Sequence, residues 1–431
     1  MSEQNLQRCP RGLAVWAALY FVVGGIMCYW IDGAFKIGGF GFMYHYIAGM
    51  AIILMAFVFF LIFPDTGKAL LLLKYSFILS LVYFIPVIWS VFLWTFDNAP
   101  FSEITKGTFY NVYLVLDILV CAGAVLMFGK RSVLFLTIAM AIGNTIILVD
   151  SAKPNPGEFV SELIKLVVTF GEVTEPMVKE VEIHDLTIAF GVLMIYALLD
   201  RELYGRWVVF LISLFFSVTG LKRIVFLAAV ICVAAYLIVR KFSEKHLRTI
   251  VIASALCWFF FTLLYITAIH GGLYDWYEKI GIDTKGRYLI YWYANQNYRM
   301  SPLYMGHGYG FSGQAWNVSA GSGFIQDALH NEYLRTYMEI GFPGYLMWFF
   351  LYFVTRPLYF LKKQGQKGGA LFIVLVMFLA FTYLTDNTYY YYYTNMAFFT
   401  CVISEKIEQL SRKESVTELL NAAERGLFCR N

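Results

Sequence analysis

Long apolar runs recur along most of this chain, and short polar connections separate them. A helix needs about 20 apolar residues to cross the roughly 30 Å hydrocarbon core of a bilayer. By that measure the pattern predicts about twelve membrane-spanning helices. The runs that we interpret as spans cover residues 13–31, 42–63, 69–94, 110–128, 132–149, 186–200, 206–220, 224–239, 247–269, 342–361, 369–384 and 388–403.

Composition agrees with this pattern. Hydrophobic residues make up 60% of the 431 positions and charged residues only 14%, whereas a water-soluble domain has about a quarter charged residues. Mean hydropathy is +0.64. The 7 cysteines are scattered without a C-x-x-C pair, which is typical of packed thiols rather than of disulfides or zinc ligands. We therefore predict an all-α integral membrane protein. A net charge of +4 gives no indication of a nucleic-acid partner.

The distribution of Lys and Arg predicts the orientation. Most of the 33 basic residues fall on the side that both termini share, and the short connections Gly129–Arg131 and Arg240–Arg248 are the clearest cases. Because cytoplasmic connections carry the excess of Lys and Arg, both termini are predicted to be cytoplasmic. The one long polar connection then lies outside the cell membrane.

This topology gives a domain organisation. Residues 1–269 hold the first nine spans and include an external amphipathic segment at 156–185. Residues 270–341 form one large extracytoplasmic loop. Residues 342–403 hold the last three spans, and 404–431 form a cytoplasmic tail.

The external segment that begins at Pro156 predicts a helix with one apolar face. Such a helix either lies in the headgroup plane of the membrane or packs on its own protein. The residues that share the apolar face are Phe159, Leu163, Ile164, Val167 and Val168.

Two arginines are candidates for binding phosphate. Arg223, preceded by Lys222, opens the eighth span on its outer side, where helix amides, the helix dipole and two cations converge. The alternative is an interfacial pair whose long side chains reach water. Arg287 falls in the first turn of a predicted loop helix, and its guanidinium can bind phosphate oxygens in bidentate fashion. The alternative is an ordinary surface arginine.

His330 is the candidate general base, because an imidazole can take a proton from a hydroxyl near neutral pH. It begins the helical run that leads into the tenth span, so a capping or packing role is the alternative. Glu332, Arg335 and Glu339 follow at one-turn spacing and could form an ion network.

Glycines and aromatic residues fill the rest of the large loop. Gly306-His307-Gly308 lies in a segment where the backbone can turn tightly or approach a ligand, but its spacing matches no nucleotide-binding loop. Flat rings suit both sugars and the membrane interface. The aromatic residues of this loop are Trp276, Tyr277, Tyr288, Tyr291, Trp292, Tyr304, Tyr309, Phe311 and Trp316.

Asp117 is an acid inside the fourth span, and pairing with Lys74 or an outer arginine is the interpretation that we favour.

Together these features resemble the O-antigen polymerase/ligase superfamily of bacterial envelope glycosyltransferases. The resemblance rests on many spans, on one large external loop late in the chain, and on Arg223 and Arg287. It also rests on three motifs, which are Pro-Leu-x-x-Gly-His-Gly-x-Gly at 302–310, His-Asn-x-Tyr-Leu at 330–334 and Glu339-x-Gly running on to Gly344.

The resemblance implies a helical, GT-C-like glycosyltransferase in the bacterial cytoplasmic (inner) membrane, with its site facing the periplasm or cell exterior. It implies a polyprenyl-diphosphate-linked oligosaccharide as donor and no metal or other cofactor, and no external loop here carries an Asp-x-Asp pair. Implied partners are the bilayer and a chain-length regulator and flippase of the same pathway. The predicted catalytic residues are His330, Arg287 and Arg223. The predicted substrate-binding residues are Lys222, Asn331, Tyr333, Glu339, Gly306, His307, Gly308, Trp292 and Tyr291.

Three functions remain open at this point. The Gly-Phe-Pro-Gly-Tyr-Leu-Met-Trp segment at 341–348 resembles polysaccharide polymerases more than ligases, so polymerisation of repeat units is favoured. Transfer of the glycan to a lipid or protein acceptor, as in O-antigen ligases, is the alternative. A flippase or transporter is less favoured, because its candidate residues should be paired between two halves near the bilayer midplane.

Overall fold

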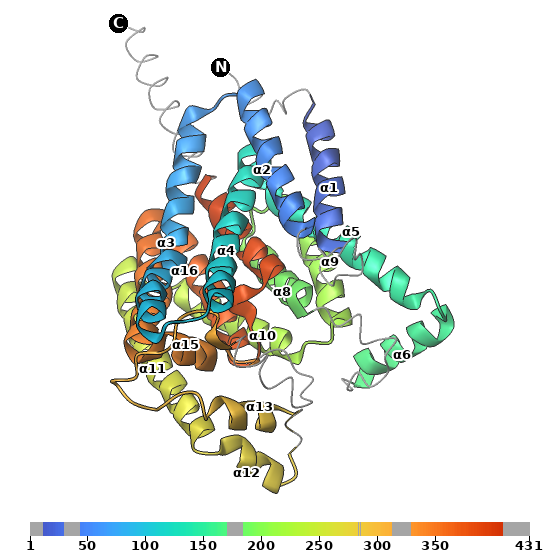
Figure 1. Ribbon diagram of the computed structural model, residues 1–431. Helices are drawn as coiled ribbons and strands as arrows, with labels where there is room; N and C mark the ends of the chain where they lie inside the picture. Colours follow the sequence, from blue (N-terminus) through green and yellow to red (C-terminus); the bar gives the residue numbers. More distant parts are fainter. Residues whose placement is uncertain are drawn as a thin grey trace, which may run out of the picture. The chain divides into compact units, whose positions relative to one another are not determined.

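The computed structural model describes residues 12–29, 44–169, 184–282, 284, 286–312 and 329–407. Within these residues the chain is helical and contains no β-strand (Figure 1). The helices are α1 (Leu13–Tyr29), α2 (Tyr44–Ile62), α3 (Thr66–Asp97), α4 (Phe101–Phe128), α5 (Arg131–Ala152), α6 (Pro156–Thr169), α8 (His184–Leu199), α9 (Arg206–Thr219), α10 (Arg223–Val239), α11 (Glu244–His270), α12 (Leu273–Lys279), α13 (Arg287–Ala294), α15 (Glu332–Phe350) and α16 (Arg356–Thr382), with a π-helical turn at Leu351–Thr355 and a 3-10 turn at Thr388–Tyr390. Residues 392–407 are also helical.

The prediction of an all-α membrane protein is confirmed for the described residues, but the count of twelve spans is not. By length and composition, six helical stretches among the described residues can cross a bilayer. Four further apolar helices are shorter; α9, for example, has 14 residues and is therefore about 21 Å long. The six long stretches are His45–Ile62, Thr66–Asp97, Phe101–Phe128, Arg131–Ala152, Glu244–His270 and Glu332–Thr382.

The longest of these stretches contains a reversal of chain direction. Gly365 has φ 71° and ψ −168°, a conformation that is essentially restricted to glycine. The rings of Phe360 and Phe372 stack with centroids 4.3 Å apart, although a straight helix would separate these positions by about 18 Å. The chain therefore folds back at Gly365, where the apolar pattern predicts a connection between two spans.

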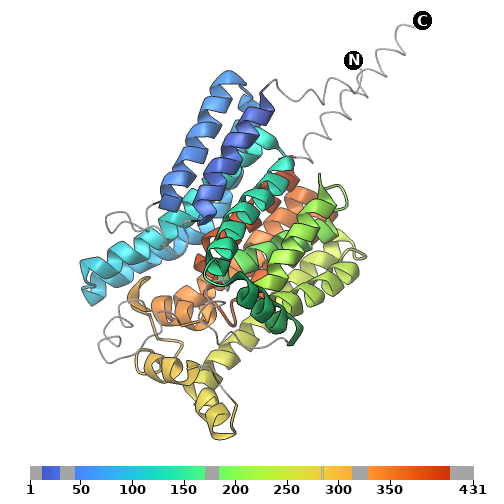
Figure 2. The same ribbon diagram turned by 90° about the vertical axis from the view of Figure 1, so that its right-hand side faces the viewer.

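The structure divides into two compact units, and the first comprises Met1–Tyr75, Leu116–Arg223 and Met396–Asn431. In this unit α1 packs on α2 and α5, and α9 packs on α5 and α8 (Figures 1 and 2). The predicted external helix forms as α6. Its Phe159 and Leu166 are buried against residues that include Leu148 and Leu221, so part of its apolar face packs on its own protein. The rest of the predicted 156–185 segment, from residue 170 to 183, lies outside the described residues.

The second unit comprises Ser76–Val115 and Ile224–Asn395 and holds most of the predicted loop. Helix α11 packs on α15 and α16, and the short helices α12 and α13 pack on each other and on α11. Figure 2 shows these two short helices close to the end of α11.

The glycine-rich segment of the loop fits against a break in α15. Gly341 has φ 64° and ψ −175°, and beside it the Phe342 amide donates to the Tyr304 carbonyl at 2.7 Å. Gly306 has φ +84°, and a Cβ atom there would lie 2.4 Å from the Glu339 carbonyl oxygen. These glycines therefore serve close backbone packing, as the tight-turn interpretation predicts.

We expect Gly306→Ala to destabilise the fold strongly, because the added methyl group would overlap the backbone of α15. Gly281→Ala is the matched control, since Gly281 has φ +80° but nothing within 4 Å of the added atom. The control should lose only the cost of a left-handed alanine, about 1–2 kcal/mol. Thermal unfolding of the purified protein in detergent measures both. Equal losses in the two variants would contradict the packing role of Gly306.

Candidate active site

Arg287 lies at the start of α13, as the sequence predicts. Gly286 precedes it with φ 76°, a left-handed conformation suited to glycine, and Ile290, Tyr291 and Ala294 form the buried face of the helix. The Arg287 side chain is half-buried, and its Nη2 donates to the Thr385 carbonyl at 3.1 Å. Because a guanidinium has five N–H donors, this single bond leaves most of its donor capacity for a ligand.

His330 lies directly ahead of α15 rather than inside it. Its φ of 48° is uncommon for a residue other than glycine, and such backbone conformations concentrate at functional sites. Its Nδ1 atom is 3.5 Å from Oδ1 of Asp386, whose side chain is only 2% exposed while that of His330 is 28% exposed. The distance is longer than a hydrogen bond but within ion-pair reach. The imidazole thus has a buried carboxylate on one side and an accessible edge.

Arg287 and His330 therefore reach the same turn from two elements. The guanidinium binds the carbonyl of Thr385, and the imidazole lies against the side chain of the next residue, Asp386. Asp386 is held in turn, since it accepts hydrogen bonds from the Asn387 amide at 3.0 Å and from the Tyr391 hydroxyl. We call His330, Arg287 and Asp386 the His330 cluster.

The start of α15 is anchored by Asn331 and Glu332. The Asn331 side chain caps the helix by accepting from the Leu334 amide at 3.0 Å. The Glu332 amide donates to the Tyr383 carbonyl at 2.9 Å. The cap fixes the start of α15, and the bond to Tyr383 ties the segment that carries His330 to the chain just ahead of Asp386.

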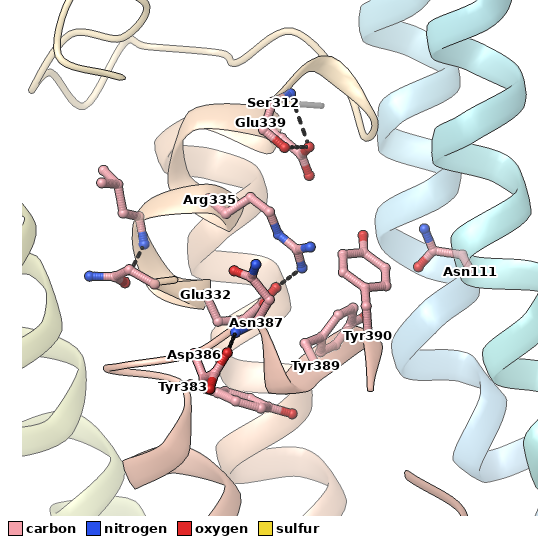
Figure 3. A network of polar contacts seen from close by, with 12 residues as sticks. Asn111, Ser312, Glu332, Arg335, Glu339, Tyr383, Asp386, Asn387, Tyr389 and Tyr390 are labelled. Atoms are coloured by element: carbon pink, nitrogen blue, oxygen red, sulfur yellow. Dashed lines mark hydrogen bonds and ion pairs between the residues drawn. The ribbon is translucent and has the colours of Figure 1, made fainter. Parts of the chain in front are cut away.

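A buried ion pair reinforces this anchor. Glu332 is fully buried, and its carboxylate pairs with Arg335 one turn later. The Arg335 guanidinium lies 3.7 Å from the centroid of the Tyr390 ring, and Figure 3 shows it between these two partners. The predicted ion network is thus present for Glu332 and Arg335.

Glu339 instead binds the glycine-rich segment. One oxygen of its carboxylate accepts from the Gly310 amide at 3.2 Å, from the Ser312 amide at 3.2 Å and from the Ser312 hydroxyl at 2.5 Å (Figure 3). Its backbone carbonyl accepts from the amides of His307 at 2.8 Å and Gly308 at 2.6 Å. In this structure Glu339 packs against or hydrogen-bonds to the glycine-rich segment. All four of these residues, Gly306, His307, Gly308 and Glu339, were predicted to bind substrate.

Residues 208–349 match a family model described as O-antigen ligase. Over these residues the chain is similar to the O-antigen polymerase/ligase superfamily. The resemblance seen in the sequence is thereby confirmed, and with it glycan transfer at the level of the superfamily. The match covers about a third of the chain and includes every predicted site residue, whereas Asp386 lies beyond it. A comparison with curated proteins finds no match.

Lys222 and Arg223 belong to the first unit, whereas the His330 cluster belongs to the second. Arg223 is exposed and opens α10, as the sequence predicts. Leu221, which precedes them, has φ 56° and packs against the buried face of α6. Helix α6 therefore braces the segment that carries the two cations.

The predicted aromatic residues divide by exposure. Trp292 is 55% exposed and available to a ligand, whereas Tyr291 and Tyr333 are buried. Tyr333 donates to the Ala380 carbonyl at 2.9 Å and accepts from Trp258 Nε1 at 2.7 Å. Burial, with a contribution from neighbouring Tyr274 and against the effect of Arg287, raises the pKa of the Tyr291 phenol above its ordinary value, so it stays neutral. Trp316 lies outside the described residues.

The interpretation of Asp117 as the partner of Lys74 or an outer arginine is wrong for the described part of the chain. Asp117 is fully buried, and neither of its carboxylate oxygens has a hydrogen-bond partner there. Nor do three or more His, Cys, Asp or Glu side chains among the described residues form a group that could hold a metal ion.

Asp386 is the site residue that sequence reasoning missed. It lies in the polar interruption Thr385-Asp386-Asn387 between the last two predicted spans. With both termini cytoplasmic, that connection falls on the same side as the large loop, and an acid there was the available signal.

We expect Asn331→Ala to lower the free energy of unfolding by about 1 kcal/mol, because it removes the cap of α15. Asn331→Ser keeps an oxygen that can accept from the Leu334 amide and should retain most of the stability. Thermal unfolding of both purified variants checks this. An unchanged Asn331→Ala variant would show that the cap is not needed.

Proposed function

We propose that this protein polymerises polyprenyl-diphosphate-linked oligosaccharide units into a surface polysaccharide on the outer face of the bacterial cytoplasmic membrane. The observation that carries the proposal is the His330 cluster, in which a candidate base, its carboxylate and a candidate phosphate-binding arginine share one turn. A base, its carboxylate and a phosphate-binding cation in one place suit glycan transfer from a diphosphate. The match of residues 208–349 to the O-antigen ligase family model supports the reaction class.

In this proposal His330 activates the acceptor hydroxyl. With Nδ1 directed at Asp386, Nε2 takes the hydroxyl proton as the acceptor oxygen bonds to the anomeric carbon of the donor sugar. The bond from that carbon to the phosphate oxygen breaks, and polyprenyl diphosphate leaves with the electron pair. Asp386 stabilises the imidazolium that forms and holds the ring in position, in the manner of the carboxylate in a catalytic triad.

Arg287 supports the leaving group. As the diphosphate departs, negative charge grows on its oxygens, and a guanidinium fixed in advance stabilises that charge without rearrangement. Its bond to the Thr385 carbonyl holds the side chain beside His330. Arg223, with Lys222, is proposed as a second phosphate contact because it opens a helix whose first amides can also donate. In this scheme the arginines supply the charge neutralisation.

The predicted substrate-binding residues take different parts in the proposal. Exposed Trp292 is the candidate to contact a sugar face. Tyr291 and Tyr333 are buried, so they are given a packing role. Asn331 orients the helix start behind His330, and Glu339 shapes the loop through the glycine-rich segment.

Ligase activity is the second candidate, because the matching family model is described as O-antigen ligase. The two activities use the same kind of donor and differ in the acceptor. The 341–348 segment, which resembles polymerases, favours a lipid-linked repeat unit as acceptor. Offering the purified protein both a lipid-linked repeat and a lipid acceptor distinguishes them: lengthened glycan supports polymerisation, and transfer only to the lipid supports ligation.

We expect Arg287→Lys to slow transfer about ten- to a hundredfold. Lysine keeps the charge but loses the two-pronged contact, and a charge-assisted hydrogen bond contributes about 1.5–3 kcal/mol. Arg248→Lys is the control, because Arg248 forms only an exposed pair with Glu244, and such pairs contribute little. Rates are measured at equal protein concentration with lipid-linked repeat units. Normal turnover in Arg287→Lys would remove Arg287 from the site.

We expect His330→Ala to leave the protein folded but to lower transfer by about 10²–10⁴-fold. Asp386→Asn should also lower it, because the amide cannot stabilise an imidazolium as a carboxylate does. If Asp386 acts through His330, the double variant should be no slower than His330→Ala alone.

The same assay, with thermal unfolding to verify folding, tests both residues. A folded His330→Ala variant that elongates glycan normally ends the general-base proposal. Fully additive losses in the double variant would give Asp386 a role independent of His330.

A further inference from the structure

A pocket lies at the far end of α13 from Arg287. It has a volume of about 560 Å³ and is lined by residues between Gln296 and Phe311. Helix α13 has 8 residues and so spans about 12 Å, which separates this pocket from the His330 cluster. We call it the α13 pocket. The lining residues that matter here are Asn297, Arg299, Ser301, Tyr304, His307 and Phe311.

The walls of the α13 pocket are tied to α15. The Tyr337 hydroxyl donates to the Arg299 carbonyl at 3.2 Å and accepts from the Ser301 amide at 3.3 Å. The Tyr304 hydroxyl donates to the Met338 carbonyl at 2.7 Å. The backbone around the pocket is therefore held in advance, and a ligand would not have to order it.

One wall presents aromatic faces. The rings of His307 and Phe311 stack with centroids 3.9 Å apart. Nδ1 of His307 lies 3.0 Å from Oδ2 of Asp97, and Nε2 lies 3.3 Å from the Asn297 carbonyl, so both nitrogens of the ring are engaged. His307 and Phe311 are half-buried and so remain partly accessible. Flat faces of this kind suit the C–H face of a sugar ring.

Arg299 gives the pocket a positive charge. It is exposed, and within the described residues its side chain makes no hydrogen bond or ion pair. The nearby carboxylate of Asp97 is directed at His307 instead. A guanidinium binds a carboxylate or phosphate through two parallel hydrogen bonds, so the pocket suits a ligand that carries an anionic group.

We propose that the α13 pocket is a subsite for an acidic sugar, that is, one with a carboxylate or phosphate substituent, within the glycan that this protein handles. The inference rests on the proposed function and narrows its substrate class. The aromatic wall receives the sugar ring, the amide and hydroxyl groups of Asn297 and Ser301 meet its hydroxyls, and Arg299 pairs with its charge. A bare phosphate ion would use Arg299 but not the aromatic wall.

Binding to the purified full-length protein tests this directly. Titration calorimetry with oligogalacturonate and with a neutral maltooligosaccharide of equal length should show tighter binding of the acidic chain. Arg299→Gln should weaken oligogalacturonate binding about ten- to a hundredfold, the equivalent of one charge-assisted contact, and leave the neutral chain unaffected. Phe311→Leu should weaken both. Lys279→Gln, which removes another exposed cation of the same unit, should change neither.

Each other result overturns the inference. No preference for the acidic chain, or a preference that survives Arg299→Gln, excludes Arg299 as its determinant. Equal affinity for inorganic phosphate and oligogalacturonate excludes a sugar subsite.

The design separates this inference from the proposed function. His330→Ala should bind oligogalacturonate normally, because His330 is not in the pocket. An active enzyme without acidic preference would overturn the subsite alone, and an inactive protein with that preference would overturn the transfer proposal alone. In the transfer assay, oligogalacturonate should raise the KM for the acceptor if the pocket holds acceptor glycan, or the KM for the donor if it holds donor glycan.

Discussion

The site depends on hydrogen bonds that satisfy irregular backbone next to membrane helices. A buried backbone N–H or C=O group without a hydrogen-bond partner is costly, so buried non-helical chain must be paired within the protein. Here the breaks in the helices supply the partners. The Glu332 amide binds the Tyr383 carbonyl, and the Glu339 carbonyl accepts two amides of the glycine-rich segment. These bonds fix the loop on α15. The positions of the residues proposed to act in catalysis depend on that placement.

Charge has a positioning role in the same region. A buried ion pair such as Glu332–Arg335 contributes little net stability, because desolvation offsets most of the attraction. What the pair does is direct the Arg335 guanidinium onto Tyr390, which holds the segment after Asp386 against the helix. The buried carboxylate of Asp386 then faces local hydrogen-bond donors and the imidazole of His330. A base needs this kind of support to keep its ring in one orientation.

Helix α13 connects the two functional proposals. Its first residue, Arg287, belongs to the His330 cluster, and the chain that follows its last turn lines the α13 pocket. Both ends are anchored to unit-two elements, through Thr385 at one end and through Tyr337 and Met338 at the other. A glycan that reached from one end to the other would be held at its reacting sugar and again further along its length.

Much of this protein follows from local patterns in the sequence. Apolar runs predicted the helices, and Arg287 was placed at a helix start, because periodicity and helix-start signals depend on neighbouring residues. Whether Arg287, His330 and Asp386 meet could not be predicted, since their contacts cross 56 to 98 positions and depend on the path of the intervening chain. The number of spans also could not be determined from the apolar pattern. A short apolar helix has the same pattern whether it crosses a bilayer or packs within the protein. Only the tertiary structure showed that Glu339 binds the glycine-rich segment. Its partners there include backbone amides, which almost every residue has, so the sequence does not indicate which of them bind a side chain.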